Sequence, residues 1–169
     1  LLLYCSHKTM NGYAKEPVLA GNTKLRPEGD LQIKRLRENA LTIDFCDVTI
    51  KGRGNSTWSL PKKPYALKFD KKTSLLGEPK DKSWVLLANY TDKTNLRNEA
   101  SFFMGRISNL EWTPRTHFVE LFMNEVYCGT YQLCEKIKIA DSRVNITDDG
   151  YLMEIDQPDR IGYHSKRRI

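Results

Sequence analysis

Long apolar stretches are missing from this chain of 169 residues. No run approaches the ~18 apolar residues that a membrane-spanning helix needs, so no transmembrane segment is expected. The first residues, Leu1 to Cys5, are apolar but too short for a signal peptide, and they lack a basic start. Because the chain begins without methionine, we expect a processed or trimmed sequence, which leaves open the earlier loss of an export signal.

Motifs for metal binding and nucleophilic catalysis are also missing. None of the four cysteines forms a CxxC pair, so no zinc site is expected. The three histidines are scattered, and no catalytic triad emerges. The glycine-and-lysine pattern of a P-loop is absent. The cysteines are either small buried thiols or, in an exported protein, disulfide partners, and the sequence leaves both alternatives open.

Nucleic-acid motifs are lacking as well, although the chain is basic. The net charge is +6, and the 27 lysines and arginines are spread along the chain. Basic residues serve nucleic acids, phosphorylated ligands or anionic surfaces, but no aromatic RNA-binding strand or finger spacing accompanies them. We therefore expect a mixed, solvated surface and no nucleic-acid partner. A composition with 40% hydrophobic and 28% charged residues is typical of a globular domain.

Alternating apolar and polar residues predict several strands, over 41–51, 64–70 and 151–156, and a continuous apolar run predicts a buried strand over 84–88. Residues 118–123 and 126–134 read as a hairpin that turns near Asn124 and Glu125.

A helix is expected over 94–107, capped by Asp92 or Thr94, with an apolar face of Leu96, Ala100, Phe103 and Ile107. Hairpins dominate and βαβ alternation is absent, which predicts an α+β fold with a mostly antiparallel sheet and one central helix. Residues 1–40 form an N-terminal extension or the first strands, and 41–169 form the main domain.

One polar loop and one lysine are candidates for binding phosphate. The loop from Arg53 to Trp58 combines a guanidinium with Asn55, Ser56 and Thr57 beside a glycine, and such a loop can aim donors at phosphate oxygens. An ordinary turn has the same composition. Lys68, on the next strand, faces opposite to its apolar neighbours and is either a phosphate-pairing lysine or an exposed strand lysine.

Three carboxylates are weaker candidates. Glu99, on the expected helix, is either a carboxylate that orients a strand lysine, as in protein kinases, or a solvent-facing helix residue. Glu154 and Asp156 share one face of an expected strand and either approach a metal ion or lie at an ordinary strand end.

Five stretches in this order resemble the CotH (spore-coat protein H) kinase family. They are Arg53–Trp58, Lys63–Phe69, Leu87–Asn98, Met123–Ile137 and Tyr151–Asp156, so that the resemblance covers about residues 41 to 156. It implies an atypical protein-kinase-like fold, of which this chain is the N-terminal part. It also implies binding of ATP with Mg²⁺ or Mn²⁺, and phosphorylation of coat or surface proteins.

The same resemblance implies roles for single residues. It places the loop with Arg53, Asn55, Ser56 and Thr57 near the nucleotide phosphates. Lys68 becomes the phosphate-pairing lysine, and Glu135 ends a segment beside the hinge between two lobes. It implies an exported, cell-surface or spore-coat location, while nothing in the sequence excludes the cytoplasm.

The resemblance also implies a limit on activity. The catalytic and metal-binding aspartates of the family lie in its C-terminal half, and no residue here matches that pair. We therefore expect a fragment that is an enzyme only when complete. The alternative is a non-catalytic surface or coat module with the same fold.

The chain by itself is expected not to phosphorylate a protein substrate, because phosphoryl transfer depends on metal ions that neutralise the β- and γ-phosphates. Transfer of radiolabelled phosphate, with Mg²⁺ or Mn²⁺, would be measured beside the Lys68→Ala variant. Metal-dependent transfer that disappears in the variant would contradict this expectation.

Overall fold

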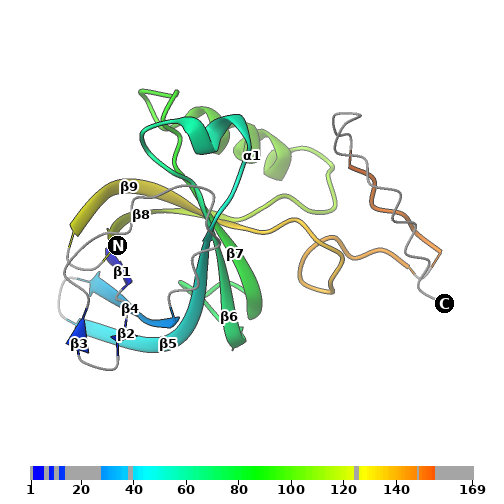
Figure 1. Cartoon of the computed structure of the whole chain (residues 1–169). Helices are drawn as coiled ribbons and strands as arrows, with labels where there is room; N and C mark the ends of the chain where they lie inside the picture. Colours follow the sequence, from blue (N-terminus) through cyan, green and yellow to red (C-terminus); the bar gives the residue numbers. More distant parts are fainter. Residues whose placement is uncertain are drawn as a thin grey trace.

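The computed structural model describes residues 2–5, 8–9, 12–13, 28–37, 40–123, 126–147 and 149–154, with side chains from Val48 onward. Seven strands close into a barrel in the order β1-β4-β5-β6-β7-β9-β8, and β2 and β3 pair as a separate two-stranded sheet beside it (Figure 1). Neighbouring barrel strands are antiparallel except for β1 and β8, which are parallel. The strands are β1 (Leu2–Cys5), β2 (Lys8–Thr9), β3 (Gly12–Tyr13), β4 (Glu28–Arg37), β5 (Ala40–Gly52), β6 (Tyr65–Thr73), β7 (Asp81–Leu87), β8 (Thr116–Met123) and β9 (Val126–Glu135).

The core fills the inside of this barrel, because strand side chains alternate between its two sides. On β6, Leu67 and Phe69 point inward and are almost fully buried, whereas Lys68 between them is exposed. The other inward-facing strands contribute a matching set of large apolar side chains: Val48, Ile50, Trp84, Leu86, Val119, Leu121, Tyr131 and Leu133. Burying one such side chain contributes about 1.5–3 kcal/mol. The strand pairing, together with one helix, confirms the predicted α+β fold with a mostly antiparallel sheet.

The predicted hairpin is confirmed in its strands. β8 and β9 pair from Thr116 opposite Cys134 to Met123 opposite Val126, and the expected turn at Asn124 and Glu125 lies outside the described residues. The pairing shifts register after Leu121, which lies opposite Gly129. Gly129 has a φ of 94°, a left-handed conformation that favours glycine. The irregularity in the pairing of β8 and β9 therefore lies beside this glycine.

The predicted strand over 151–156 is wrong in its described part. Residues Tyr151 to Glu154 adopt no regular secondary structure and are exposed, and Asp156 lies outside the described residues. The alternation that predicted this strand has no partner strand here, and a strand needs one to satisfy its backbone groups.

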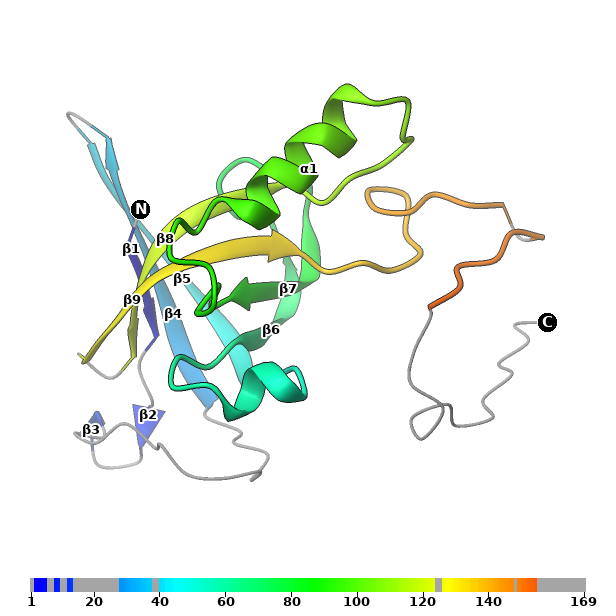
Figure 2. The ribbon, with the colours of Figure 1, turned by 90° about the horizontal axis from the view of Figure 1, so that it is seen from above.

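The single described helix, α1 (Arg97–Ile107), lies across the outer face of the sheet, over β8 and β9 (Figure 2). It begins three residues later than predicted. Asp92 fixes this start, since its carboxylate accepts hydrogen bonds from the backbone N–H of Arg97 (2.8 Å) and from the Thr94 hydroxyl (2.7 Å). The same hydrogen bonds, that of Thr94 first, hold the pKa of Asp92 below its usual range. Asp92 thus accepts a hydrogen bond from the first residue of the helix, as expected, although the N-cap position itself is Leu96, whose side chain forms no capping hydrogen bond.

The apolar face of α1 does not pack on the sheet, contrary to the pattern-based expectation. Leu96, Phe103, Met104 and Ile107 are 53–61% exposed. The only buried residue of the helix is Gly105. Polar contacts decide how the helix sits, because Glu99 accepts hydrogen bonds from Thr116 of β8 and Gln132 of β9.

No helix in the described ranges is long and apolar enough to cross a membrane.

Gly105 provides a test of this helix placement. A Cβ at this position would lie 2.6 Å from Oγ1 and 2.9 Å from Cγ2 of Thr113. Gly→Ala in a helix interior ordinarily stabilises by up to about 1 kcal/mol. Here Gly105→Ala is expected to destabilise by about 1–3 kcal/mol, since it overpacks the contact.

Urea denaturation would measure the free energy of unfolding of this variant, of Thr113→Ala and of the double variant. Removing the Thr113 side chain should restore most of the loss in the double variant. An increase in stability in Gly105→Ala alone would show that the helix does not approach Thr113 as described.

Candidate functional site

A hollow of about 270 Å³ lies between the loop that follows β5 and the segment that links β7 to α1. Two cations, two threonine hydroxyls and two amides line it, together with an aromatic ring and apolar side chains. The lining residues are Arg53, Gly54, Thr57, Leu60, Lys62, Pro64, Leu87, Ala88, Asn89, Tyr90, Thr91 and Asn98. None of these residues is acidic, so the lining complements an anion rather than a metal ion. We call this site the loop hollow.

The loop that forms one wall is tied closed by its own backbone. The Arg53 N–H donates to the Pro64 carbonyl (3.2 Å), and a short 3₁₀ turn, η1 (Ser56–Ser59), lies between them. Gly54 has a φ of 84°, and a Cβ on Gly52 would overlap the Trp58 ring at 2.3 Å. Both glycines are therefore needed for this tight path.

Lys62 is one of the two cations that line the loop hollow. Its ammonium donates a hydrogen bond to the Thr130 carbonyl and sits 4.6 Å from the centre of the Tyr131 ring. Burial lowers the pKa of Lys62, and the Glu120 carboxylate opposes this effect. Lys62 is not among the site residues predicted from the sequence. The signal that could have found it is the lysine pair, Lys62 and Lys63, directly after the loop.

The residues predicted from the sequence to bind the nucleotide are only partly brought together. Arg53 and Thr57 line the loop hollow, whereas Asn55 and Ser56 lie exposed on the same loop outside the lining. Lys68 lies on β6, opposite Thr49 and Ser83, and its side chain points to solvent. Arg53, Ser56 and Lys68 therefore do not converge on one pocket.

Glu135 ends β9, and its carboxylate is fully buried. It accepts hydrogen bonds from Nε of Arg115 (3.0 Å), from Nη2 of Arg115 (2.7 Å) and from the Arg115 backbone N–H (3.0 Å). It also forms an ion pair with the buried Arg143, whose guanidinium lies 4.9 Å from the centre of the Trp84 ring. Protein groups thus already engage the carboxylate, and it does not line the loop hollow.

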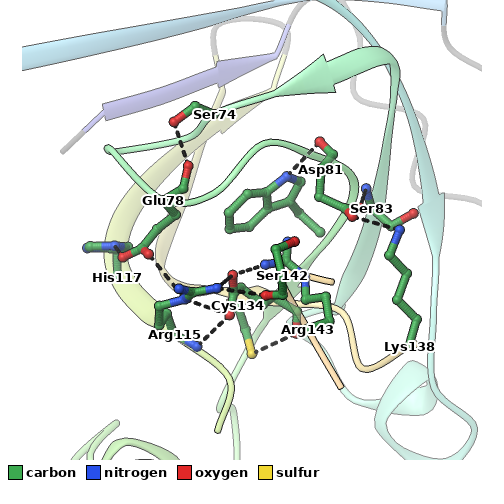
Figure 3. A network of polar contacts seen from close by, with 12 residues as sticks. Ser74, Glu78, Asp81, Ser83, Arg115, His117, Cys134, Lys138, Ser142 and Arg143 are labelled. Carbon is green, nitrogen blue, oxygen red and sulfur yellow. Dashed lines mark hydrogen bonds and ion pairs between the residues drawn. The ribbon is translucent and has the colours of Figure 1, made fainter. Parts of the chain in front are cut away.

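The same polar network continues outward from Glu135. Arg115 contacts Glu78 (3.2 Å) and donates to the Ser142 carbonyl (2.9 Å), and His117 contacts Glu78 (2.8 Å). Figure 3 shows Glu78, Arg115, His117, Ser142 and Arg143 close to one another. The network fastens the segment after β9 to the barrel.

A second ion pair fastens the same segment. Lys138 pairs with Asp81 at the start of β7 (2.7 Å). Burial alone would raise the pKa of Asp81, but the hydrogen bonds from Lys138 and from the Ser83 N–H hold it below its usual range. A depressed carboxyl pKa means that this contact stabilises the fold at neutral pH and is lost as the pH falls through the folded-state value.

Glu99 faces the sheet, so the solvent-facing alternative is wrong. Its described partners are Arg106, Thr116 and Gln132, and none of them is a lysine. Gln132 also accepts a hydrogen bond from Asn89 (3.0 Å), and Asn89 accepts one from Asn98 (2.8 Å). Side chains of the loop hollow are therefore joined to α1 by a continuous chain of hydrogen bonds.

Two further expectations concern metal ions and thiols. Within the described ranges, no group of three or more His, Cys, Asp or Glu side chains is arranged to hold a metal ion. Glu154 is exposed there, and its proposed partner Asp156 is not described. Cys128 and Cys134 are free thiols, and burial raises the pKa of Cys134 to about 12.

Comparison with known families matches residues 50–168 to the family model described as CotH kinase protein. The match spans more than half of the chain, and the chain belongs to the CotH family, whose name associates it with the spore coat. A comparison with curated proteins found no match. The resemblance read from the five sequence stretches is thus confirmed.

The buried Glu135 contact provides a stability test. Glu135→Gln keeps the shape of the side chain but removes the buried negative charge that pairs with Arg115 and Arg143, so the free energy of unfolding should fall by about 3 kcal/mol or more. The matched control is Glu111→Gln, which changes an exposed glutamate and should cost less than about 0.5 kcal/mol. Equal, small effects of both substitutions in urea denaturation would contradict the role given to Glu135.

Proposed function

We propose that this chain carries the nucleotide-binding site of a CotH-type protein kinase and that the loop hollow receives the phosphate groups of ATP. The observation that carries the proposal is the lining itself, which has two cations, hydroxyls and amides but no carboxylate. Phosphate oxygens are acceptors only, and cationic and neutral donors match them. The kinase acts on a protein of the spore coat or cell surface, in keeping with the family.

The position of the loop hollow supports this proposal. A glycine-containing loop joins two antiparallel strands, β5 and β6, beside the segment that leads into α1. In protein kinases a glycine-rich loop covers the phosphates. Leu87, Ala88 and Tyr90 add apolar and aromatic surface to the same hollow, which suits the flat face of a nucleobase.

The divalent cation of the proposed ATP complex, Mg²⁺ or Mn²⁺, has no fitting ligands in the lining. Hard cations prefer carboxylate and carbonyl oxygens, whereas the charged side chains here are Arg53 and Lys62. The lining residues thus fit the phosphates and not the metal. Their part is to bind and orient the nucleotide.

A non-catalytic binding module is the second candidate function. The exposed apolar side of α1, with Phe103, Met104 and Ile107, favours it, because contiguous apolar surface marks sites of protein contact. One measurement separates the two functions. A binding module contacts its partner with the same affinity whether or not ATP is present. A kinase site acts on its partner only when ATP is bound.

Titration calorimetry of the chain with ATP and Mg²⁺ tests the proposed site. Arg53→Ala is expected to weaken ATP binding by about tenfold or more, since a charge-assisted hydrogen bond contributes about 1.5–3 kcal/mol. Lys72→Ala is the matched control, because it removes the same charge from an exposed position on β6 outside the lining. Absence of ATP binding to the unaltered chain, or equal loss in both variants, would refute the site.

A further inference from the structure

Lys62 combines three properties that no other residue of the loop hollow shares. It is a cation, and it is half-buried. Its ammonium is also held in place by two protein groups, the Thr130 carbonyl and the Tyr131 ring. A lysine ammonium has three donors. No described carboxylate forms an ion pair with it, and Glu120 acts only as a more distant attraction.

Thr130 and Tyr131, which contact the Lys62 ammonium, are themselves held in place. The Tyr131 hydroxyl donates to the carbonyl of Lys63 (2.9 Å), which anchors the backbone next to Lys62 to the core strand β9. Gly129, with its left-handed backbone, marks the bulge in β9 directly before Thr130. A Cβ at Gly129 would come 3.7 Å from Cε of Lys62, so the lysine chain runs closely over this bulge. The ammonium is therefore preorganised before any ligand arrives.

Lys68 lacks these properties. It is exposed on β6, between the inward-facing Leu67 and Phe69, and does not line the loop hollow. The carboxylate of Glu99, which would orient a lysine in a protein kinase, is engaged by Arg106, Thr116 and Gln132 instead. The described part of the chain thus contains no pair of strand lysine and helix carboxylate at Lys68.

We infer that Lys62, and not Lys68, is the lysine that contacts the phosphate groups of the ligand, and that the Thr130 carbonyl and the Tyr131 ring hold it in place of a helix carboxylate. This inference rests on the proposed function for the identity of the ligand as ATP. It extends that function by assigning the second cation of the site and the groups that orient it. Arg53 and Lys62 then bind the phosphates from two different segments of the loop.

Binding of two probes, ATP with Mg²⁺ and inorganic tripolyphosphate, would be measured for the full chain, for Lys62→Met and for Lys68→Met. Both substitutions remove one charge and keep the length of the side chain. Lys62→Met should weaken the binding of both probes by about tenfold or more, and Lys68→Met should weaken it by less than about twofold. Equal urea-denaturation midpoints for the two variants would show that the difference does not reflect misfolding.

A second measurement uses the unaltered chain and so does not depend on the folding of a variant. An amine-reactive acetylating reagent, read out by mass spectrometry at each lysine, should label Lys62 severalfold more slowly when tripolyphosphate is present. The labelling rate of Lys68 should not change. Protection of Lys68 without protection of Lys62 would overturn the inference.

The outcomes separate the inference from the proposed function. ATP binding that is insensitive to Lys62→Met, with no protection of Lys62, overturns the inference and leaves the nucleotide site standing. Binding of tripolyphosphate that depends on Lys62, without binding of ATP, supports the inference and refutes the nucleotide. Failure of both probes to bind the unaltered chain refutes both.

Discussion

The buried carboxylate of Glu135 is the constraint on which the rest of this structure depends. Burying a charge costs several kcal/mol unless partners compensate for it, and here Arg115 and Arg143 do so from two different segments. Arg115 directly precedes β8, Glu135 ends β9, and Arg143 belongs to the segment beyond it. One carboxylate therefore fixes the end of β9 against the start of β8 and holds the following segment to the barrel. The strand held in this way supplies Thr130, Tyr131 and Gln132 to the neighbourhood of the loop hollow.

The loop hollow and α1 are not independent parts. Asn89 and Asn98 line the hollow, and through Gln132 they reach Glu99 in the helix. A ligand group that takes a hydrogen bond from either amide competes with this chain, and a buried amide that loses a partner is costly. The placement of α1 relative to β8 and β9 thus depends on the same side chains that would touch a ligand. Because the apolar side of α1 is exposed, these polar contacts carry more of its orientation than packing does.

The proposed phosphate ligand has two independent supports, the family match and the chemistry of the loop hollow. The family is assigned from sequence over residues 50–168, whereas the preference for an anion follows from the charges that the fold brings together. Fold alone does not determine function, so the proposed phosphate ligand is supported by Arg53, Lys62 and the amides of the lining. The absence of acidic residues from this lining separates the binding of phosphate from the binding of a metal ion.

The sequence by itself determined the alternating strands, the hairpin of β8 and β9, the presence of α1 and the family, because these depend on local periodicity and on short stretches read in order. It also marked Arg53 and Thr57, which belong to a loop of unusual composition. Only the tertiary structure decided which lysine reaches the hollow, since that depends on β9, 68 residues away from Lys62 along the chain. It likewise decided that Glu135 is buried between arginines and that Glu99 faces the sheet. A helical or strand pattern defines faces, but residues distant in sequence determine which face is covered, and no local period records them.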